Sequence, residues 1–98
     1  MDGVGFTGAV GGVADSRHLL GLAADWIPRE TDAATVYRWC ALRAERLEFD
    51  RLNIYTGLQP MTLHVDLRLW EEGPPRRRFY RDSPWRRVDR DGAIALVI

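Results

Sequence analysis

The chain has 98 residues and a hydrophobic fraction of 46%, which suits one domain with one hydrophobic core and excludes an intrinsically disordered protein. Its 14 basic residues balance its 14 acidic residues, so no net field draws the whole molecule to nucleic acid or to an anionic membrane. Cys40 is the single cysteine, which excludes an internal disulfide and a cysteine-based zinc site. All the basic residues are arginines, a bias typical of GC-rich genomes, which indicates a bacterial or phage source.

The N-terminal segment, residues 1–14, is rich in glycine and small apolar residues. This composition fits either a mobile arm or a short edge strand, and both interpretations remain open. The segment lacks the basic residues of a signal peptide, and no apolar run approaches the roughly 20 residues that span a bilayer. We therefore expect a cytoplasmic protein in which residues 15–98 form a single α+β domain.

Two helices are predicted in the first half of the chain. The first spans residues 15–27, with good N-cap residues at its start and a proline directly after it. The second begins at Thr31 or Asp32. Its apolar stripe consists of Ala33, Val36, Tyr37, Cys40, Ala44 and Leu47. Trp39 and Leu42 lie off this stripe, so we expect another element or a partner to cover them.

Antiparallel strands are predicted for the rest of the chain. Apolar and polar side chains alternate from Arg51 onward, most regularly in residues 61–70. Turns are predicted at residues 56–60, 71–75, 83–84 and 91–92. The strands between them are residues 51–55, 61–70, 76–81, 85–89 and 93–98. The prediction is an α+β fold with two helices packed on one face of a four- to five-stranded antiparallel meander sheet.

The core of this fold is expected to combine the stripe of the second helix with one face of the strands. The alternation in residues 61–70 puts four aliphatic side chains on that face. The predicted core residues are Val36, Cys40, Leu47, Leu63, Val65, Leu67, Leu69, Ile94 and Leu96.

Few residues of the chain offer catalytic or metal-binding chemistry. His64, Asp66 and Arg68 share one face of a predicted strand and suit an acid–base pair or part of a metal site, although a metal needs further ligands. Cys40 lies on the apolar stripe of a helix and fits a core residue better than a nucleophile. The sequence contains no serine-centred elbow, phosphate-binding loop or paired-carboxylate motif. We therefore expect a protein that is not an enzyme and needs no metal or cofactor.

Charged and aromatic residues are concentrated in residues 76–90. Seven arginines stand against two aspartates there, and three aromatic residues lie among them. Arginine binds carboxylate or phosphate groups through paired hydrogen bonds, and aromatic rings stack on bases or on the side chains of a partner. The predicted partner-binding residues are Arg76, Arg77, Arg78, Tyr80, Arg81, Trp85, Arg86 and Arg87, together with Trp39 and Leu42 of the second helix.

This pattern favours a small protein interaction module, such as an adaptor, an inhibitor or an assembly subunit. A protein partner or self-association is preferred to nucleic acid, because a dedicated nucleic-acid module usually carries a net positive charge. One alternative is an RNA- or DNA-binding domain that acts through residues 76–90. Another is that these arginines only pair with acidic residues across strands and cover the sheet.

The predicted order of an edge strand, two helices and an antiparallel meander resembles the layout of the RelE and ParE family of bacterial toxins. Residues 78–81 and 88–98 are similar to that family's final pair of strands, in which an arginine-bearing strand precedes a hydrophobic one. If the chain binds nucleic acid, the resemblance implies that it acts as a toxin-like ribonuclease. It does not extend to catalytic residues, so none is assigned.

Overall fold

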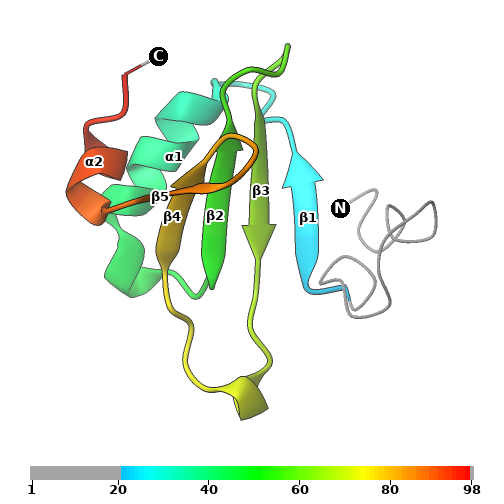
Figure 1. Ribbon diagram of the computed structural model, residues 1–98, viewed down its shortest axis with the longest axis vertical. Helices are drawn as coiled ribbons and strands as arrows, with labels where there is room; N and C mark the ends of the chain where they lie inside the picture. The colour runs from blue at the N-terminus through cyan, green and yellow to red at the C-terminus, as the bar shows by residue number, and fades with distance from the viewer. Residues whose placement is uncertain (1–20, 98) are drawn as a thin grey trace.

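The computed structural model describes residues 21–97. Over this range the chain forms one five-stranded sheet and two α-helices (Figure 1). The elements in chain order are β1 (Ala23–Trp26), α1 (Ala33–Leu42), the 3-10 turn η2 (Ala44–Arg46), β2 (Arg51–Tyr55), β3 (Thr62–Asp66), the 3-10 turn η3 (Trp70–Glu72), β4 (Arg78–Arg81), β5 (Arg86–Val88) and α2 (Arg90–Ile94). The predicted arm at residues 1–14 and the start of the predicted first helix lie outside the described residues.

The five strands form a mixed sheet in the order β1-β3-β2-β4-β5. Neighbouring strands pair antiparallel except β2 and β4, which run parallel. The α+β class is confirmed, but the antiparallel meander is wrong. The chain leaves β3 on one side of β2, passes round the start of β2 and returns as β4 on its other side (Figure 1).

Asp50, directly before β2, holds this crossover in place. Its carboxylate, in a residue that is 1% exposed, accepts hydrogen bonds from the backbone N–H (3.0 Å), Nε (2.9 Å) and Nη2 (2.7 Å) of Arg76. The backbone N–H of Asp50 donates to the Asp66 carbonyl, and its carbonyl accepts from the Arg78 N–H. One residue therefore ties β3 and β4 to opposite sides of β2, a long-range arrangement that local alternation of side chains does not encode.

The helix α1 begins where the sequence predicts. Asp32 is its N-cap, and its side chain accepts a hydrogen bond from the Thr35 backbone N–H (2.7 Å). The helix ends at Leu42, earlier than the predicted stripe. Its buried residues are Ala33, Ala34, Tyr37 and Ala41. Val36 and Cys40 are only partly buried, so the side of α1 that meets the sheet is lined mainly by alanine.

The core lies between the helices and the face of the sheet that they cover. Phe79, 2% exposed, contacts the rings of Tyr37 and Phe49 edge-on, at centroid distances of 5.7 and 5.3 Å. Tyr37 also donates its hydroxyl to the Tyr80 carbonyl (2.8 Å), which joins α1 to β4. Of the predicted core, Leu63 and Leu96 are buried, and Val36, Cys40, Leu47, Val65 and Ile94 pack against it partly buried.

The prediction of a helix through residue 27 is wrong, because Ala23–Trp26 form the strand β1. This strand pairs with β3 from Ala23↔Asp66 to Trp26↔Leu63. Gly21 has a φ of 72°, in the left-handed region, which interrupts a right-handed helix at that point. Pairing with β3 thus outweighs the helical spacing of a short apolar segment.

Leu67 and Leu69 are not core residues, contrary to the prediction. They lie beyond the end of β3 and are 46% and 39% exposed. Arg51, the first residue of β2, pairs with Asp66, so beyond Asp66 there is no β2 residue left for β3 to pair with. The alternation of side chains continues in the sequence, but the strand does not.

The predicted hairpin at Asp91–Gly92 and the strand at residues 93–98 are also wrong. Asp89 is the N-cap of α2 and accepts a hydrogen bond from the backbone N–H of the glycine (2.7 Å), so Asp–Gly lies in the first turn of a helix. α2 packs against α1, where Arg38 donates to the Leu96 carbonyl (2.9 Å). Neither helix in residues 21–97 combines the length and the apolar character needed to cross a bilayer.

Candidate functional site

The sheet carries its helices on one face, which leaves the other face without a helix (Figure 1). In β2, Leu52 and Ile54 are buried in the core between Arg51, Asn53 and Tyr55. Successive side chains of a strand point to opposite faces, so those three residues belong to the helix-free face.

The register of the sheet brings one residue from each strand into a single row across this face. Asn53 of β2 lies opposite His64 of β3 and beside Tyr80 of β4. His64 lies opposite Asp25 of β1, and Tyr80 lies opposite Arg87 of β5. The row therefore runs from an acidic edge to a basic edge through an imidazole and a phenol.

A buried ion network occupies the acidic end of the row. His64 lies between two carboxylates, with Nδ1 2.8 Å from Asp25 Oδ1 and Nε2 3.3 Å from Asp66 Oδ2. Arg51 donates from Nε (3.0 Å) and Nη2 (2.6 Å) to the same Asp66 oxygen. Asp66 is completely buried and His64 is nearly so, while Asp25 and Arg51 are partly exposed. When His64 is protonated, two cations and two carboxylates balance in charge around its nearly buried ring.

The two carboxylates decide the protonation of His64. Burial lowers the pKa of this imidazole, but hydrogen bonds to Asp25 and to Asp66 raise it by more, so the net pKa is raised above its ordinary value. The charged form is favoured, and both ring nitrogens then act as donors. With a carboxylate at each ring nitrogen, His64 suits a structural role in the network better than that of a general base with a free lone pair.

Replacing His64 with glutamine should flatten the dependence of stability on pH. Because the folded-state pKa is raised, protonation of His64 stabilises the fold fully below the unfolded pKa of about 6.5. This stabilisation is lost as the pH rises through the folded-state pKa. Urea unfolding between about pH 5.5 and about pH 9 should show wild-type stability declining across that range more than the stability of the variant. Parallel profiles for the two proteins would contradict a charged His64.

Trp85 lies over this network and covers it. Its ring centroid is 4.8 Å from that of His64 and 5.4 Å from that of Tyr80. The guanidinium of Arg51 lies 4.7 Å from the Trp85 ring, and that of Arg87 lies 5.9 Å from the Tyr80 ring. We call Arg51, Trp85, Tyr80 and Arg87 the aromatic–arginine face.

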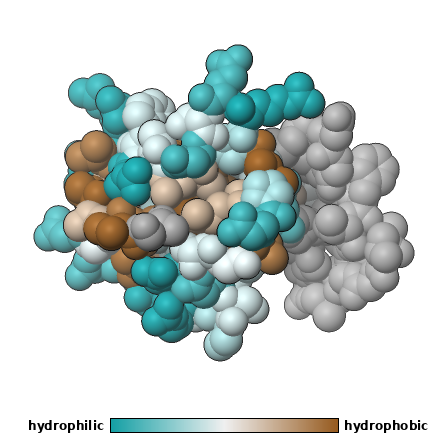
Figure 2. Space-filling model, turned by 90° about the horizontal axis from the view of Figure 1, so that it is seen from above, coloured by the Kyte–Doolittle hydropathy of each residue, from teal (hydrophilic) through white to brown (hydrophobic). Residues whose placement is uncertain are grey.

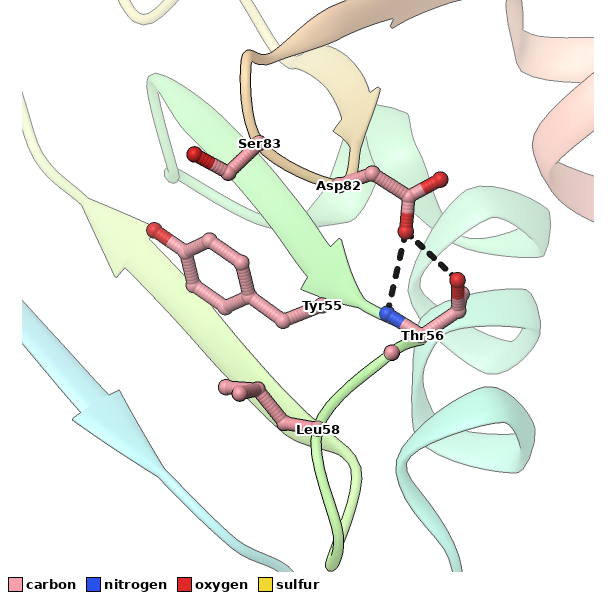
Figure 3. Close-up of a pocket in the computed structure, with 6 residues that line it drawn as sticks. Tyr55, Thr56, Leu58, Asp82 and Ser83 are labelled. Carbon is pink, nitrogen blue, oxygen red and sulfur yellow. Dashed lines mark hydrogen bonds between the residues drawn. The ribbon is translucent and has the colours of Figure 1, made fainter.

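A shallow pocket of about 470 Å³ adjoins this face (Figure 3). It is lined by Tyr55, Thr56, Gly57, Leu58, Asp82 and Ser83. The Tyr55 hydroxyl accepts a hydrogen bond from the indole N–H of Trp85 (3.2 Å), which links the pocket to the face. Tyr55 and the exposed Leu58 extend to one side, whereas the Asp82 carboxylate turns toward Thr56 (Figure 3). The pocket therefore offers a ligand mainly apolar surface.

The Asp82 carboxylate is already occupied by donors from its own chain. It accepts hydrogen bonds from the backbone N–H (3.1 Å) and the hydroxyl of Thr56, from Arg81 Nε (3.0 Å) and from Arg86 Nη2 (2.9 Å). The hydrogen bond from the Thr56 hydroxyl is the largest of the effects on the pKa of Asp82, and together with these arginines it holds that pKa well below the ordinary range. Asp82 therefore fixes the loop that carries Trp85.

The structure brings together only part of the predicted partner surface. Tyr80, Trp85 and Arg87 meet on the helix-free face, and the register places Arg78 beside Arg51 there. The other arginines of the segment donate to acceptors of their own chain: Arg76 to Asp50, Arg77 to the Leu47 carbonyl, Arg81 and Arg86 to Asp82 within the segment, and Arg90 to Glu45 and to carbonyls of α1. These arginines cross-link the fold, with partners that the sequence pattern did not identify.

Trp39 and Leu42 form a separate surface on the outer side of α1. They are 47% and 54% exposed, and the Arg43 guanidinium lies 4.5 Å from the Trp39 ring. Figure 2, a view from above, shows that hydrophobic residues also gather on the α2 side of the molecule, where Val97 is 83% exposed. The predicted partner residues therefore divide between two opposite sides of the sheet.

The sequence pattern did not identify Asp25 and Arg51 as neighbours of His64 and Asp66. Alternation placed His64 and Asp66 on one face, but it also joined them to Arg68, which lies beyond the end of β3. Asp25 was expected on a helix, and only its pairing with His64 in the sheet reveals its role. The alternation in β2 was the one available signal for Arg51.

The chemistry of this site suits recognition by rings and guanidinium groups. Within residues 21–97, no group of three or more histidine, cysteine, aspartate or glutamate side chains is placed to hold a metal ion. Burial raises the pKa of the Cys40 thiol on α1, which favours its protonated, unreactive form.

Comparisons with protein-family models, with curated proteins and with solved structures found no match to this chain.

Proposed function

We propose that this chain is a small, non-enzymatic protein-binding module that recognises its partner through the aromatic–arginine face. The observation that supports this is the row of contacts in which Arg51 lies on Trp85, Trp85 on Tyr80, and Arg87 on Tyr80. Each contact restricts a side chain in advance, which lowers the entropy lost on binding. Arginine, tryptophan and tyrosine are also the residues most enriched among binding hot spots.

The chemistry of the face defines the kind of partner that fits it. Arg87 is exposed, so carboxylates of a partner can reach its guanidinium group, whereas Arg51 already donates to Asp66. Trp85 and Tyr80 offer partly exposed rings, and the pocket at Leu58 continues the apolar area. A partner segment that combines acidic side chains with aromatic or aliphatic ones would satisfy both parts.

A protein partner is favoured over nucleic acid because most arginines of residues 76–90 are already engaged. Arg76, Arg81 and Arg86 donate to carboxylates, and Arg77 donates to a backbone carbonyl. Phosphate groups would have to displace these acceptors before the segment could act as a basic patch. The net charge of zero adds no long-range attraction to a polyanion.

Single-stranded nucleic acid is the second candidate, because partly exposed rings on an open sheet face are also stacking platforms for bases. Tyr80 and Trp85, whose ring centroids are 5.4 Å apart, provide such a platform beside Arg87. Binding of nucleic acid is distinguished from binding of a protein by its salt dependence, since release of counterions from phosphates makes the affinity fall steeply as salt is raised.

Selection of random peptides displayed on phage tests the proposal. Peptides of about 12 residues, long enough for the extended and helical modes of peptide recognition, would be selected on the wild-type chain. We expect acidic and aromatic sequences that bind the Tyr80→Ala, Arg87→Ala variant at least about tenfold more weakly, as for loss of a hot spot. The matched control is Trp39→Ala, Leu42→Ala on the opposite side of the molecule, which should bind like wild type. Selected peptides that lose affinity only for the α1 variant would contradict the proposal.

Titration with single-stranded oligonucleotides provides the opposing measurement. The tryptophan fluorescence would be followed at about 50 mM and about 200 mM salt, a range over which phosphate contacts weaken strongly. Saturable quenching that declines with salt, and that the Tyr80→Ala, Arg87→Ala variant abolishes, would replace the protein partner by nucleic acid. No quenching at the lower salt concentration is the result expected here.

A further inference from the structure

The end of the molecule beyond β3 carries three exposed apolar side chains. Leu67 is 46%, Leu69 is 39% and Trp70 is 87% exposed. Figure 1 places η3, to which Trp70 belongs, at the far end of the loop between β3 and β4, away from the sheet. We call residues 67–72 the tryptophan tip. A concentration of exposed apolar side chains of this kind marks an interaction surface.

The tryptophan tip is held in a fixed conformation. The Leu69 backbone N–H donates to the Glu72 side chain (2.8 Å), and the Glu72 N–H donates to the Leu69 carbonyl (2.9 Å). The loop is then anchored to the sheet where Arg76 binds Asp50. The backbone turn that carries Trp70 is therefore preorganised, so docking would need little reordering of this backbone.

A groove of about 320 Å³ lies beside Trp70. It is lined by Glu48, Arg68, Trp70, Gly73, Pro74 and Pro75. Arg68 is directed to the Pro74 carbonyl, at 3.5 Å, and Glu48 and Glu71 are exposed at this end of the molecule. A guanidinium group that entered the groove could lie against the Trp70 ring and pair with Glu48.

We propose that the tryptophan tip of one copy docks on the aromatic–arginine face of a second copy, head to tail. This inference rests on the proposed function, because it names the partner of the same face. The tip offers the Trp70 ring and carboxylates, which can contact the rings and arginines of the face. The face offers the exposed Arg87, which can enter the groove beside Trp70. The tip lies at the far end of the β3–β4 loop, whereas Arg87 lies on the edge strand β5 (Figure 1). A contact between the tip and Arg87 therefore joins two copies of the chain. Each pair keeps one tip and one face for further copies.

Sedimentation equilibrium of the full chain tests this contact at about 10 µM and about 500 µM protein, since interfaces burying less than about 1,200 Å² are typically weak. The tip variant is Trp70→Ala, Glu71→Ala, and the face variant is Tyr80→Ala, Arg87→Ala. We expect the average mass of the wild type to rise with concentration, and each variant alone to associate at least about tenfold more weakly. Circular dichroism would confirm that both variants are folded.

Mixing the two variants gives the decisive result. The intact face of the tip variant should take the intact tip of the face variant, so an equimolar mixture should form a complex of two chains that grows no further. A chain with both pairs of substitutions is the control and should join neither variant. Variants that stay separate when mixed, or a tip variant that associates like wild type, overturn the contact.

Failure of this contact and failure of the proposed function are distinguishable. A wild-type chain that stays monomeric while its aromatic–arginine face captures acidic peptides overturns the head-to-tail contact and leaves the proposed function standing. Flotation of the wild type with vesicles of anionic phospholipid, abolished by Trp70→Ala, would instead assign the tip to a membrane. The carboxylates of Glu71 and Glu72 oppose that result, since they are repelled by an anionic surface.

Discussion

Replacing Asp66 with alanine is expected to lower the free energy of unfolding by about 3 kcal/mol, near the lower end of what breaking a buried ion pair costs. Asp66 is completely buried, and one of its oxygens accepts from Arg51 (2.6 and 3.0 Å) and lies 3.3 Å from His64. Its removal leaves a nearly buried imidazolium with one carboxylate fewer and frees the guanidinium beneath Trp85. Urea unfolding followed by tryptophan fluorescence measures the loss.

The matched control is Asp32→Ala at the N-cap of α1, an exposed carboxylate that accepts one backbone hydrogen bond. Loss of such an exposed cap should cost clearly less than breaking the buried ion pair. Similar losses for the two variants would show that the network beneath Trp85 does not stabilise the fold as a unit. The aromatic–arginine face would then lack the support that its preorganisation requires.

Phe79→Ala should be the most destabilising change in the apolar core, with a loss of about 3–5 kcal/mol. The Phe79 ring, 2% exposed, contacts both Tyr37 and Phe49, so its removal leaves a cavity between α1 and the sheet. Phe79→Leu retains much of the volume and should cost clearly less. Equal losses for the two variants in urea unfolding would contradict a tightly packed aromatic cluster.

Local features of the fold were predictable because their signals are local. The cap at Asp32 fixes the start of α1, and the alternation from Arg51 identifies β2. The break at Ser83–Pro84 correctly separates β4 from β5. The order of the strands was not predictable, because it depends on the bonds of Asp50 to Arg76 across the crossover, and alternation identifies a strand without naming its neighbours.

The candidate site was likewise predictable only in its local part. Tyr80, Trp85 and Arg87 lie close in sequence, so composition alone drew attention to them. The ion network beneath them combines Asp25 with His64 from different strands, whereas the sequence pattern placed Asp25 on a helix. The exposure of Leu67 and Leu69 was missed because alternation in residues 61–70 implied a longer strand than the pairing partner allows.

The passage of the chain round the start of β2 also implies an order in which the sheet assembles. β2 and β3 are consecutive and joined by a short turn, so their pairing closes a small loop at low entropic cost. β4 can pair with β2 only after residues 67–77 have crossed that strand end, which makes it a longer-range contact and a slower one. We therefore expect the β2–β3 hairpin to form early and the segment from β4 to α2 to pair with it later. Amide protons of that C-terminal segment should exchange with solvent through openings that leave the hairpin intact.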